Sequence, residues 1–325
     1  MRLHRLTAAV TLLAALLAHA VPACAQGFPS KPIRMYTQFG AGAPGDVFAR
    51  IFAASLSTVI GQPVIIDSRP GGGGVLVASL TTRAEPDGYT VVMLTATVPV
   101  SIALPSRTPL PFDPSKDLTP VAMVIEAASL LVASNTLGVN SVSELIEFAK
   151  KNPGKLSYGT TGIVSSHHLN GEQFDMLTGT QMVHIPYKSA PVADTAAGML
   201  PLTYAIAAQA MPFIRSGKVR ALAMTTDRRL KTLPDVPMMQ EVVPGFDPAP
   251  AWTGVYGPAR LPPAVLRRLH DDINRSLSVP DVVSKINDVG FDVVLSATAE
   301  EFAQRMKKGI DLTARIVKAA KIEPQ

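Results

Sequence analysis

The sequence predicts an α/β fold. From residue 33 onward, short apolar segments of strand length alternate with amphipathic helical patterns, which is typical of layered α/β proteins. Apolar residue types make up 47% of the 325 residues and charged types 17%, so the chain can bury a large core. A chain of this length is long enough for two ordinary domains.

The first group of expected elements lies between residues 33 and 94. We expect strands at 33–39, 63–67 and 89–94, and helices at 46–60 and 75–83. A proline-rich connection follows at 99–120. The apolar stretch 121–132 is long enough to pass from one lobe of the protein to another.

A second α/β group follows this stretch. Ser141 and Glu144 have the spacing of a capping box, so a helix is expected to begin there and to end before Pro153. Strands are expected at 156–158, 182–185, 202–206 and 219–224, with a returning strand at 252–256.

Two helices are expected to close the chain. The first carries apolar residues at every fourth position from Val265 to Leu277, which places them on one face. The second begins at a capping box formed by Thr298 and Glu301 and continues through Ile310.

The N-terminus has the three parts of a secretory signal peptide. A basic start, 1–5, precedes an almost wholly apolar run, 6–18, and small residues supply a cleavage site after Ala25. Residues 1–25 are therefore expected to be removed, which leaves a soluble periplasmic protein. The alternative is a lipoprotein anchored through Cys24, which Pro22 disfavours.

Charge and cysteine content exclude several classes of protein. The net charge of +5 includes Arg2 and Arg5 of the leader, so the mature chain carries about +3, without a block of Lys or Arg. This distribution does not support nucleic-acid binding, which needs clustered cations. Cys24 is the only cysteine, which excludes a disulfide framework and a Cys-rich metal site.

A glycine-rich turn follows the first expected strand. Gly40, Gly42 and Gly45 satisfy the pattern G-x-G-x-x-G between a strand and a helix, and Asp67 ends the next strand, as in a dinucleotide-binding unit. Pro44, however, removes a backbone donor where a pyrophosphate would need one. Two interpretations stay open: an exported NAD-dependent oxidoreductase that uses this loop, and a backbone site for a smaller anion.

A second strand–turn–helix junction lies in the other group of elements. Residues 160–162 follow a strand, and Ser165 and Ser166 open the next helix. Free N–H groups at a helix start, with hydroxyls around them, bind carboxylate or phosphate readily. The alternative is that one serine only caps the helix. Two such junctions facing each other would enclose a small anion, to which Thr95 and Thr97 would add hydroxyls.

Catalytic signatures are few. A serine hydrolase would need Ser165 or Ser166 with His168 and an aspartate, but no G-x-S-x-G or H-E-x-x-H motif accompanies them. His167 and His168 would point about 100° apart on a helix, which does not suit a shared metal ion. Asp46, at the start of the first helix, is interpreted as its cap. No catalytic residue, metal or cofactor is therefore predicted.

Short motifs along nearly the whole mature chain carry a resemblance to a known family. They are FPSKPIR (28–34), GQPV (61–64), RPG (69–71), PDGYT (86–90), YGTTG (158–162), HL (168–169), HIPYK (184–188), GKVRALA (217–223), LPDVP (233–237) and KAAKI (318–322). In this order they resemble the substrate-binding proteins of tripartite tricarboxylate transporters, the Bordetella uptake gene (Bug) type receptors.

The resemblance implies a two-lobed periplasmic binding protein, type II-like, with a ligand cleft between two α/β domains. Lobe 1 is expected to comprise residues 26–123 and 252–325, and lobe 2 residues 124–251. The ligand would be a small organic carboxylate, either a di- or tricarboxylate or an aromatic acid. The partner would be the membrane permease of such a transporter or a sensor protein, and the receptor is expected to be a monomer without enzymatic activity.

The residues and the resemblance together predict one ligand site made by loops of both lobes. The predicted ligand-binding residues are Phe39, Gly40, Ala41, Gly42, Ala43, Gly45, Asp46, Thr95, Thr97, Thr160, Thr161, Gly162, Ser165, Ser166 and His168.

The sequence also departs from the family pattern. The departures are Gln38 and Ala43 in the first loop, Ile163 and Val164 in the second loop, a missing glycine after Lys188, the segment 199–201, and Ala205. Several of them are apolar. They lead to the hypothesis that the second lobe suits an aromatic or otherwise apolar-bodied carboxylate better than citrate.

Overall fold

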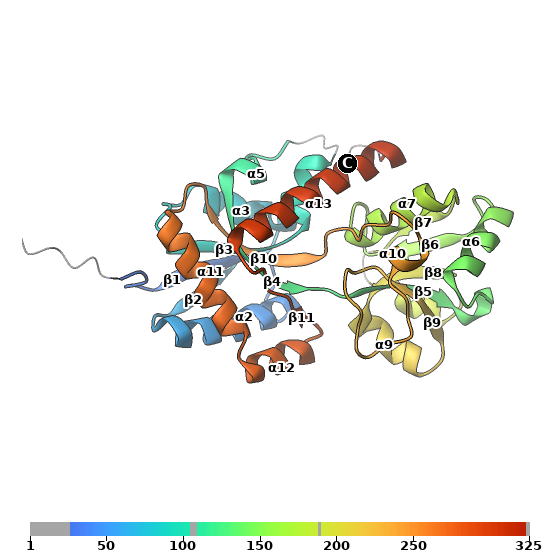
Figure 1. Ribbon diagram of the computed structural model, residues 1–325, viewed down its shortest axis with the longest axis horizontal. Helices are drawn as coiled ribbons and strands as arrows, with labels where there is room; N and C mark the ends of the chain where they lie inside the picture. Colours follow the sequence, from blue (N-terminus) through green and yellow to red (C-terminus); the bar gives the residue numbers. More distant parts are fainter. Residues whose placement is uncertain (1–26, 105–108, 188–189, 323–325) are drawn as a thin grey trace, which may run out of the picture.

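The computed structural model describes residues 27–104, 109–187 and 190–322. The expected signal peptide, with Cys24, lies outside the described residues, as does Lys188. The chain forms two α/β bodies (Figure 1), of which we call the one built on a six-stranded sheet lobe 1 and the one built on a five-stranded sheet lobe 2. Within the described ranges, no helix has both the length and the apolar character that crossing a bilayer requires.

The sheet of lobe 1 combines parallel strands with strands that return antiparallel. Its strands, in spatial order, are β11 (Asp292–Val293), β4 (Leu118–Glu126), β10 (Trp252–Pro258), β3 (Thr90–Thr95), β1 (Ile33–Thr37) and β2 (Val64–Ser68). β1 pairs parallel with β2 and β3, whereas β10 pairs antiparallel with β3 and β4. The returning strand expected at 252–256 is therefore confirmed.

Helices cover both faces of this sheet. They are α2 (Pro44–Ile60), α3 (Val75–Thr82), α4 (Thr97–Val100), α5 (Pro114–Asp117), α11 (Pro263–Leu277), α12 (Pro280–Asp288) and α13 (Ala299–Ala320), with 3-10 turns η1 (Gly72–Gly74) and η2 (Ser101–Ala103). On one face Phe52 of α2 and Ile273 of α11 share a buried cluster with Met35. On the other face Phe302 of α13 packs against Tyr256 of β10, with ring centroids 5.2 Å apart.

Lobe 2 is a second three-layer unit. Its strands, in spatial order, are β7 (Val183–Pro186), β6 (Ser157–Thr160), β8 (Leu202–Ile206), β5 (Ser129–Ser134) and β9 (Val219–Met224). Its helices are η3 (Asn135–Leu137), α6 (Val142–Lys151), α7 (Ser166–Thr178), α8 (Val192–Ala196), α9 (Ala207–Arg215) and α10 (Met239–Val242). Leu145 and Phe174 belong to the core on one face of the sheet, and Val192 and Ala210 to the core on the other.

Both expected caps are confirmed, but the helix inventory is longer than expected. Ser141 Oγ accepts the Glu144 N–H at 3.1 Å, and Thr298 Oγ1 accepts the Glu301 N–H at 3.0 Å. The prediction of two closing helices is wrong, because α12 lies between them. This short helix begins with Pro280, which is favourable in a first turn although it suggests a break when read as sequence.

The chain passes between the lobes along two neighbouring segments. β4 ends at Glu126 in the sheet of lobe 1 and β5 begins at Ser129 in the sheet of lobe 2, so the apolar stretch 121–132 does connect the two. The return segment runs beside it, because the Ala127 N–H donates to the Ala251 carbonyl at 3.3 Å. The exact residues that limit each lobe stay a prediction.

Helix α13 also links the lobes. It begins on the sheet of lobe 1, and its C-terminal half reaches lobe 2 (Figure 1). There Leu312 and Ile316 share a buried apolar cluster with Leu169 of α7 and with Ala249 of the return segment. The lobes are therefore joined by a packed helix as well as by the two crossing segments.

Candidate ligand-binding site between the lobes

A cavity of about 280 Å³ lies where the two lobes face each other. Lobe 1 contributes Phe39, Thr95, Ala96, Thr97 and Phe291; lobe 2 contributes Thr161, Ser165, Ser166, His167 and Ile206; the crossing segments and adjoining strands contribute Ile125, Ala127, Ser129, Pro250, Ala251, Trp252 and Thr253. The cavity is thus built from segments far apart in the sequence, as a cleft between two lobes requires.

The N-terminus of α7 forms one wall of this cavity. Ser165 is the N-cap, with extended φ and ψ of −60° and 158°, and its Oγ accepts the His168 N–H at 3.2 Å. The N–H groups of Ser166 and His167, in the first turn, have no acceptor within the helix. Partial positive charge from the helix dipole gathers at the same place. This wall is therefore suited to a carboxylate, even though Ser165 is also a cap.

His167 lies beside the hydroxyl of Ser129 in the cavity wall. The Nε2–Oγ distance is 3.1 Å, and His167 is only 4% exposed. Burial lowers the pKa of His167 to about 4, so the imidazole is neutral at pH 7. Among the described residues its Nδ1 has no hydrogen-bond partner.

The geometry does not favour a serine hydrolase. Ser165 Oγ donates to the Gly162 carbonyl at 2.8 Å, and His168 Nδ1 accepts the Val164 N–H at 2.9 Å, so these two side chains do not form a nucleophile–base pair. His167 does contact Ser129, but no described carboxylate bonds its Nδ1, and its low pKa makes it a weak base at neutral pH.

A buried hydrogen-bond network holds the second loop in place. His168 stacks on His184 with ring centroids 3.8 Å apart, and its Nε2 lies 3.2 Å from the Glu172 carboxylate. The Tyr158 hydroxyl also donates to Glu172, at 2.7 Å. Thr160 Oγ1 lies 2.6 Å from His184 Nε2. Thr160 and His168 therefore shape the loop that carries the site, and do not line the cavity.

The loop of residues 39–45, which follows β1, contributes Phe39 to the cavity. The turn that follows Phe39 is held by hydrogen bonds within lobe 1. Gly42 adopts a φ of 76°, which permits the turn, and its N–H donates to Asp46 Oδ2 at 3.0 Å. The same carboxylate accepts from Arg50 Nε and from the Ser68 hydroxyl, both at 3.0 Å. The hydrogen bond from Arg50 and those from Gly42 and Ser68 hold the pKa of Asp46 below its ordinary value, despite burial.

The interpretation of Asp46 as the helix cap is wrong. Helix α2 starts two residues earlier than expected, with Ala43 as N-cap and Pro44 in the first turn. Proline has the φ of a helix and lacks only an N–H that would be unpaired there. Asp46 consequently lies at the third helical position, and its carboxylate reaches back to Gly42.

The glycine pattern also has a structural explanation. A Cβ on Gly45 would lie 2.4 Å from the Phe39 ring, so this glycine makes room for a side chain that lines the cavity. Asp67 forms two hydrogen bonds with Arg69, at 3.0 and 3.1 Å. The residues that would hold a dinucleotide are thus engaged in contacts within lobe 1.

The structure brings together only part of the predicted site. The predicted residues that line the cavity are Phe39, Thr95, Thr97, Thr161, Ser165 and Ser166. Those that do not line it are Gly40, Ala41, Gly42, Ala43, Gly45, Asp46, Thr160, Gly162 and His168. Sequence reasoning missed Ser129, His167, Ile206, Trp252 and Phe291; only the expected crossing at 121–132 could have pointed to Ser129.

The apolar departures from the family pattern lie away from the cavity. Ile163 and Met199 are exposed, Val164 packs near α13, and Ala205 belongs to the core of lobe 2. Gln38 acts indirectly, because its Nε2 donates to Thr95 Oγ1 at 3.2 Å. The cavity is nevertheless rich in apolar side chains, which come from other residues.

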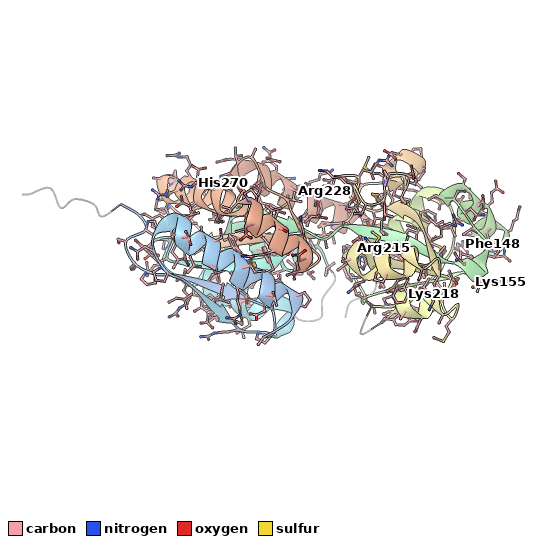
Figure 2. The ribbon with its side chains drawn as sticks, turned by 90° about the horizontal axis from the view of Figure 1, so that it is seen from below. Phe148, Lys155, Arg215, Lys218, Arg228 and His270 are labelled. Carbon is pink, nitrogen blue, oxygen red and sulfur yellow. The ribbon has the colours of Figure 1, made fainter. Side chains whose placement is uncertain are left out.

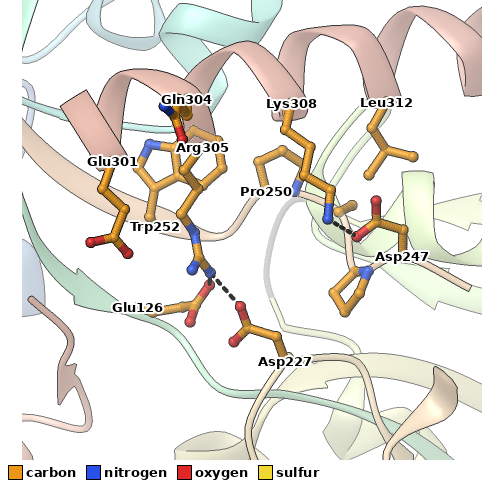
Figure 3. A pocket seen from close by; sticks show the side chains of 13 residues that line it. Glu126, Asp227, Asp247, Pro250, Trp252, Glu301, Gln304, Arg305, Lys308 and Leu312 are labelled. Carbon is orange, nitrogen blue, oxygen red and sulfur yellow. Dashed lines mark hydrogen bonds and ion pairs between the residues drawn. The ribbon is translucent and has the colours of Figure 1, made fainter. Parts of the chain in front are cut away.

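A second cavity, of about 420 Å³, is lined by α13, the crossing segments and Asp227 of lobe 2 (Figure 3). Arg305 of α13 lies 2.8 Å from Glu126 and 2.9 Å from Asp227, and Lys308 lies 2.9 Å from Asp247. These ion pairs connect α13 with the crossing strand and with lobe 2. Because these charged groups already neutralise each other, the smaller, uncharged cavity is the better candidate for the ligand site.

A further ion pair connects the two lobes. Arg228, which lies where the lobes meet (Figure 2), is 3.3 Å from Asp292 of lobe 1. Among the described residues, no group of His, Cys, Asp or Glu is arranged to hold a metal ion.

Two α/β lobes that share a cavity across two crossing segments have the architecture of periplasmic solute-binding proteins such as BugD. The model of the tripartite tricarboxylate transporter family receptors matches residues 48–322, and the chain belongs to this family. BugT of Bordetella pertussis is 32% identical over 299 residues, which cover 91% of each chain.

Two solved structures of similar proteins contain carboxylates. An R. palustris protein solved with adipate has a TM-score of 0.73 at 29% identity and covers 92% of this chain and 100% of its own. MatC from Rhodopseudomonas palustris with bound malate has a TM-score of 0.69 at 26% identity and covers 89% and 100%.

Proposed function

We propose that this protein is a non-enzymatic periplasmic receptor for a small organic carboxylate. The observation that carries the proposal is the start of α7, whose first residues, Ser166 and His167, line a cavity shared by both lobes. A carboxylate placed there accepts hydrogen bonds from the backbone and from nearby hydroxyls, which are strong because the acceptor is charged. The adipate and malate found in similar proteins support this ligand class.

Binding and release follow from the two-lobed construction. When the lobes approach each other, water leaves the cavity and the hydrogen bonds to the carboxylate strengthen in the drier surroundings. The ligand stabilises the closed arrangement because only there does it contact Thr95 and Thr97 of lobe 1 together with Ser166 of lobe 2. No bond of the ligand is broken in this cycle.

The cellular role follows from the family and from the expected leader. Removal of residues 1–25 would deliver the mature chain to the periplasm, where the closed, loaded form would be presented to the permease of a tripartite tricarboxylate transporter or to a sensor protein. We expect the receptor to act as a monomer, without nucleic acid and without a cofactor.

Native mass spectrometry of protein purified from the periplasm without refolding tests this function. We expect the mass of the chain without residues 1–25 and, after denaturing release, one small carboxylic acid per chain. A passenger of dinucleotide mass would instead support the NAD-dependent alternative. Retention of residues 1–25, or a lipid on Cys24, would contradict the proposed form of the mature protein.

A further inference from the structure

The described residues that line the cavity between the lobes have uncharged side chains. The polar groups of its described residues are the hydroxyls of Thr95, Thr97, Ser129, Thr161, Ser165, Ser166 and Thr253, the His167 imidazole and the Trp252 indole N–H; no Asp, Glu, Lys or Arg is among the described residues that line it. The Trp252 N–H already donates to the Tyr256 hydroxyl at 3.1 Å. A charged ligand group must therefore be balanced by backbone N–H groups and dipoles.

Lobe 2 supplies one set of backbone N–H groups that can balance a charged ligand group. Helix α7 is 13 residues long, and its first residues, Ser166 and His167, line the cavity. His167, 4% exposed and with Nδ1 unpartnered among the described residues, lies at the same wall. Its Nδ1 is a buried polar atom without a partner, and because the ring is neutral it adds no charge to this wall.

Lobe 1 does not supply a second helix start that could bind an anion. The start of its long helix α2 already has a carboxylate, that of Asp46, which accepts from the Gly42 N–H at 3.0 Å. The start of α2 does not line the cavity, and its Gly42 N–H is not available to a ligand anion because Asp46 already accepts it. Helix α4, whose first residue Thr97 lines the cavity, spans only Thr97–Val100, so it has little dipole to offer.

The remaining walls favour an apolar body. Phe39 and Phe291 come from lobe 1, Ile206 from lobe 2 and Ile125 from the strand that leads into the crossing. The volume of about 280 Å³ is slightly below the usual range of ligand cavities, about 300 to 1,000 Å³. A second carboxylate among these side chains would lose its hydration and would meet neutral hydroxyls, but no cation among the described residues.

We infer that the preferred ligand is a small monocarboxylate with an uncharged, apolar body, such as an aromatic acid, whose carboxylate binds at the start of α7 and whose body contacts Phe39 and Phe291. This inference rests on the proposed receptor function and narrows it. Di- and tricarboxylates of the same size are weaker ligands.

Trp252 provides a direct readout. It is the only tryptophan of the chain and lines the cavity, so its fluorescence reports on ligand binding. Ligand-free protein is titrated with benzoate, terephthalate, adipate and citrate, and thermal unfolding is followed with the same acids. Benzoate and terephthalate form the matched pair, because they differ only in a second carboxylate at the far end of one ring. We expect benzoate to bind at least about 30-fold more tightly than the other three acids.

The possible results separate this inference from the proposed function. If terephthalate, adipate or citrate binds as tightly as benzoate or more tightly, the monocarboxylate inference is overturned and the receptor function stands. If none of the four acids binds at 1 mM, the monocarboxylate inference is overturned, and the passenger released in native mass spectrometry decides the receptor function.

Two matched variants test the place of the apolar body. Phe291→Ala should weaken benzoate binding about tenfold, because a contact surface is lost. Phe148→Ala removes a phenylalanine from the exposed side of α6, remote from the cavity (Figure 2), and should leave the affinity unchanged. Thermal unfolding of both variants verifies that they fold. Equal benzoate affinities in folded Phe291→Ala and Phe148→Ala would place the body elsewhere and overturn this arrangement.

Discussion

Replacing Ser166 by proline tests whether a backbone N–H at the start of α7 holds the ligand. Ser166 is the first residue of the helix, where proline is well tolerated and removes only an N–H that has no acceptor within the helix. The residue before it, Ser165, has φ and ψ of −60° and 158°, which is the conformation that a following proline requires. The substitution therefore deletes one donor and leaves the helix intact.

The magnitude follows from the kind of hydrogen bond that is lost. A hydrogen bond to a charged group contributes about 1.5–3 kcal/mol, so the affinity should fall about 10- to 150-fold. Ser166→Ala is the matched control, because it removes the hydroxyl, as proline does, but keeps the N–H. The difference between the two variants isolates the backbone donor.

The assay is the fluorescence of Trp252 during titration with the tightest-binding acid, together with urea unfolding of each variant. We expect Ser166→Pro to bind at least about tenfold more weakly than Ser166→Ala, with unfolding free energies that differ by less than about 1 kcal/mol. Equal affinities in two equally stable variants would refute the assignment of the carboxylate to this helix start.

Three further predictions concern other parts of the molecule. Gly45→Ala should displace the Phe39 ring, which lies 2.4 Å from the position of the new Cβ, and should weaken ligand binding and lower the temperature of thermal unfolding. When Phe39→Ala is added to the same chain, the alanine at position 45 should no longer lower this temperature. Burial lowers the pKa of His167 from its ordinary value of 6.5 to about 4 in the folded protein. As the pH falls below about 6.5, the unfolded chain therefore takes up the proton before the folded protein does. The free energy of unfolding should consequently decrease between about pH 6.5 and pH 4, by at most about 3 kcal/mol. Urea unfolding at pH 7 and pH 5 should show a smaller decrease in unfolding free energy for His167→Gln than for the unchanged protein. An equal decrease in both would contradict the assignment of this pH dependence to His167. Arg305→Met should lower the free energy of unfolding by about 2–4 kcal/mol, because it leaves the buried Glu126 carboxylate without its cation. Adding Glu126→Gln should restore most of this loss. A double variant that is no more stable than Arg305→Met would contradict the importance of this ion pair.

The sequence pattern predicts most strands because buried strands are short apolar runs between turn residues. The crossing at 121–132 is predicted for the same reason, since one apolar stretch was too long for a single strand. Helices with proline were misjudged. Pro44 and Pro280 lie in first turns, where proline is compatible with the helix, and Pro212 lies within α9.

The candidate site is only partly predictable because it combines local and non-local features. The start of α7 is a local feature, formed by consecutive residues with turn and cap preferences, and Ser165 and Ser166 could be found from it. Phe291 and Ile206 reach the cavity only through the packing of whole lobes, and no pattern in their surroundings marks them. Asp46 was misplaced for a local reason, a shift of the helix start by two residues.

The packing of α13 across both lobes has a mechanical consequence. Any rotation that widens or narrows the cleft must slide Leu312 and Ile316 over Leu169, because the first two belong to a helix anchored on lobe 1 and the third to α7. The packing of the C-terminal helix therefore limits the angle between the two lobes in the absence of ligand. Shortening the chain to end before Leu312 would remove this contact between α13 and α7 without removing a strand, and we expect it to change the angle at which the two lobes enclose the ligand.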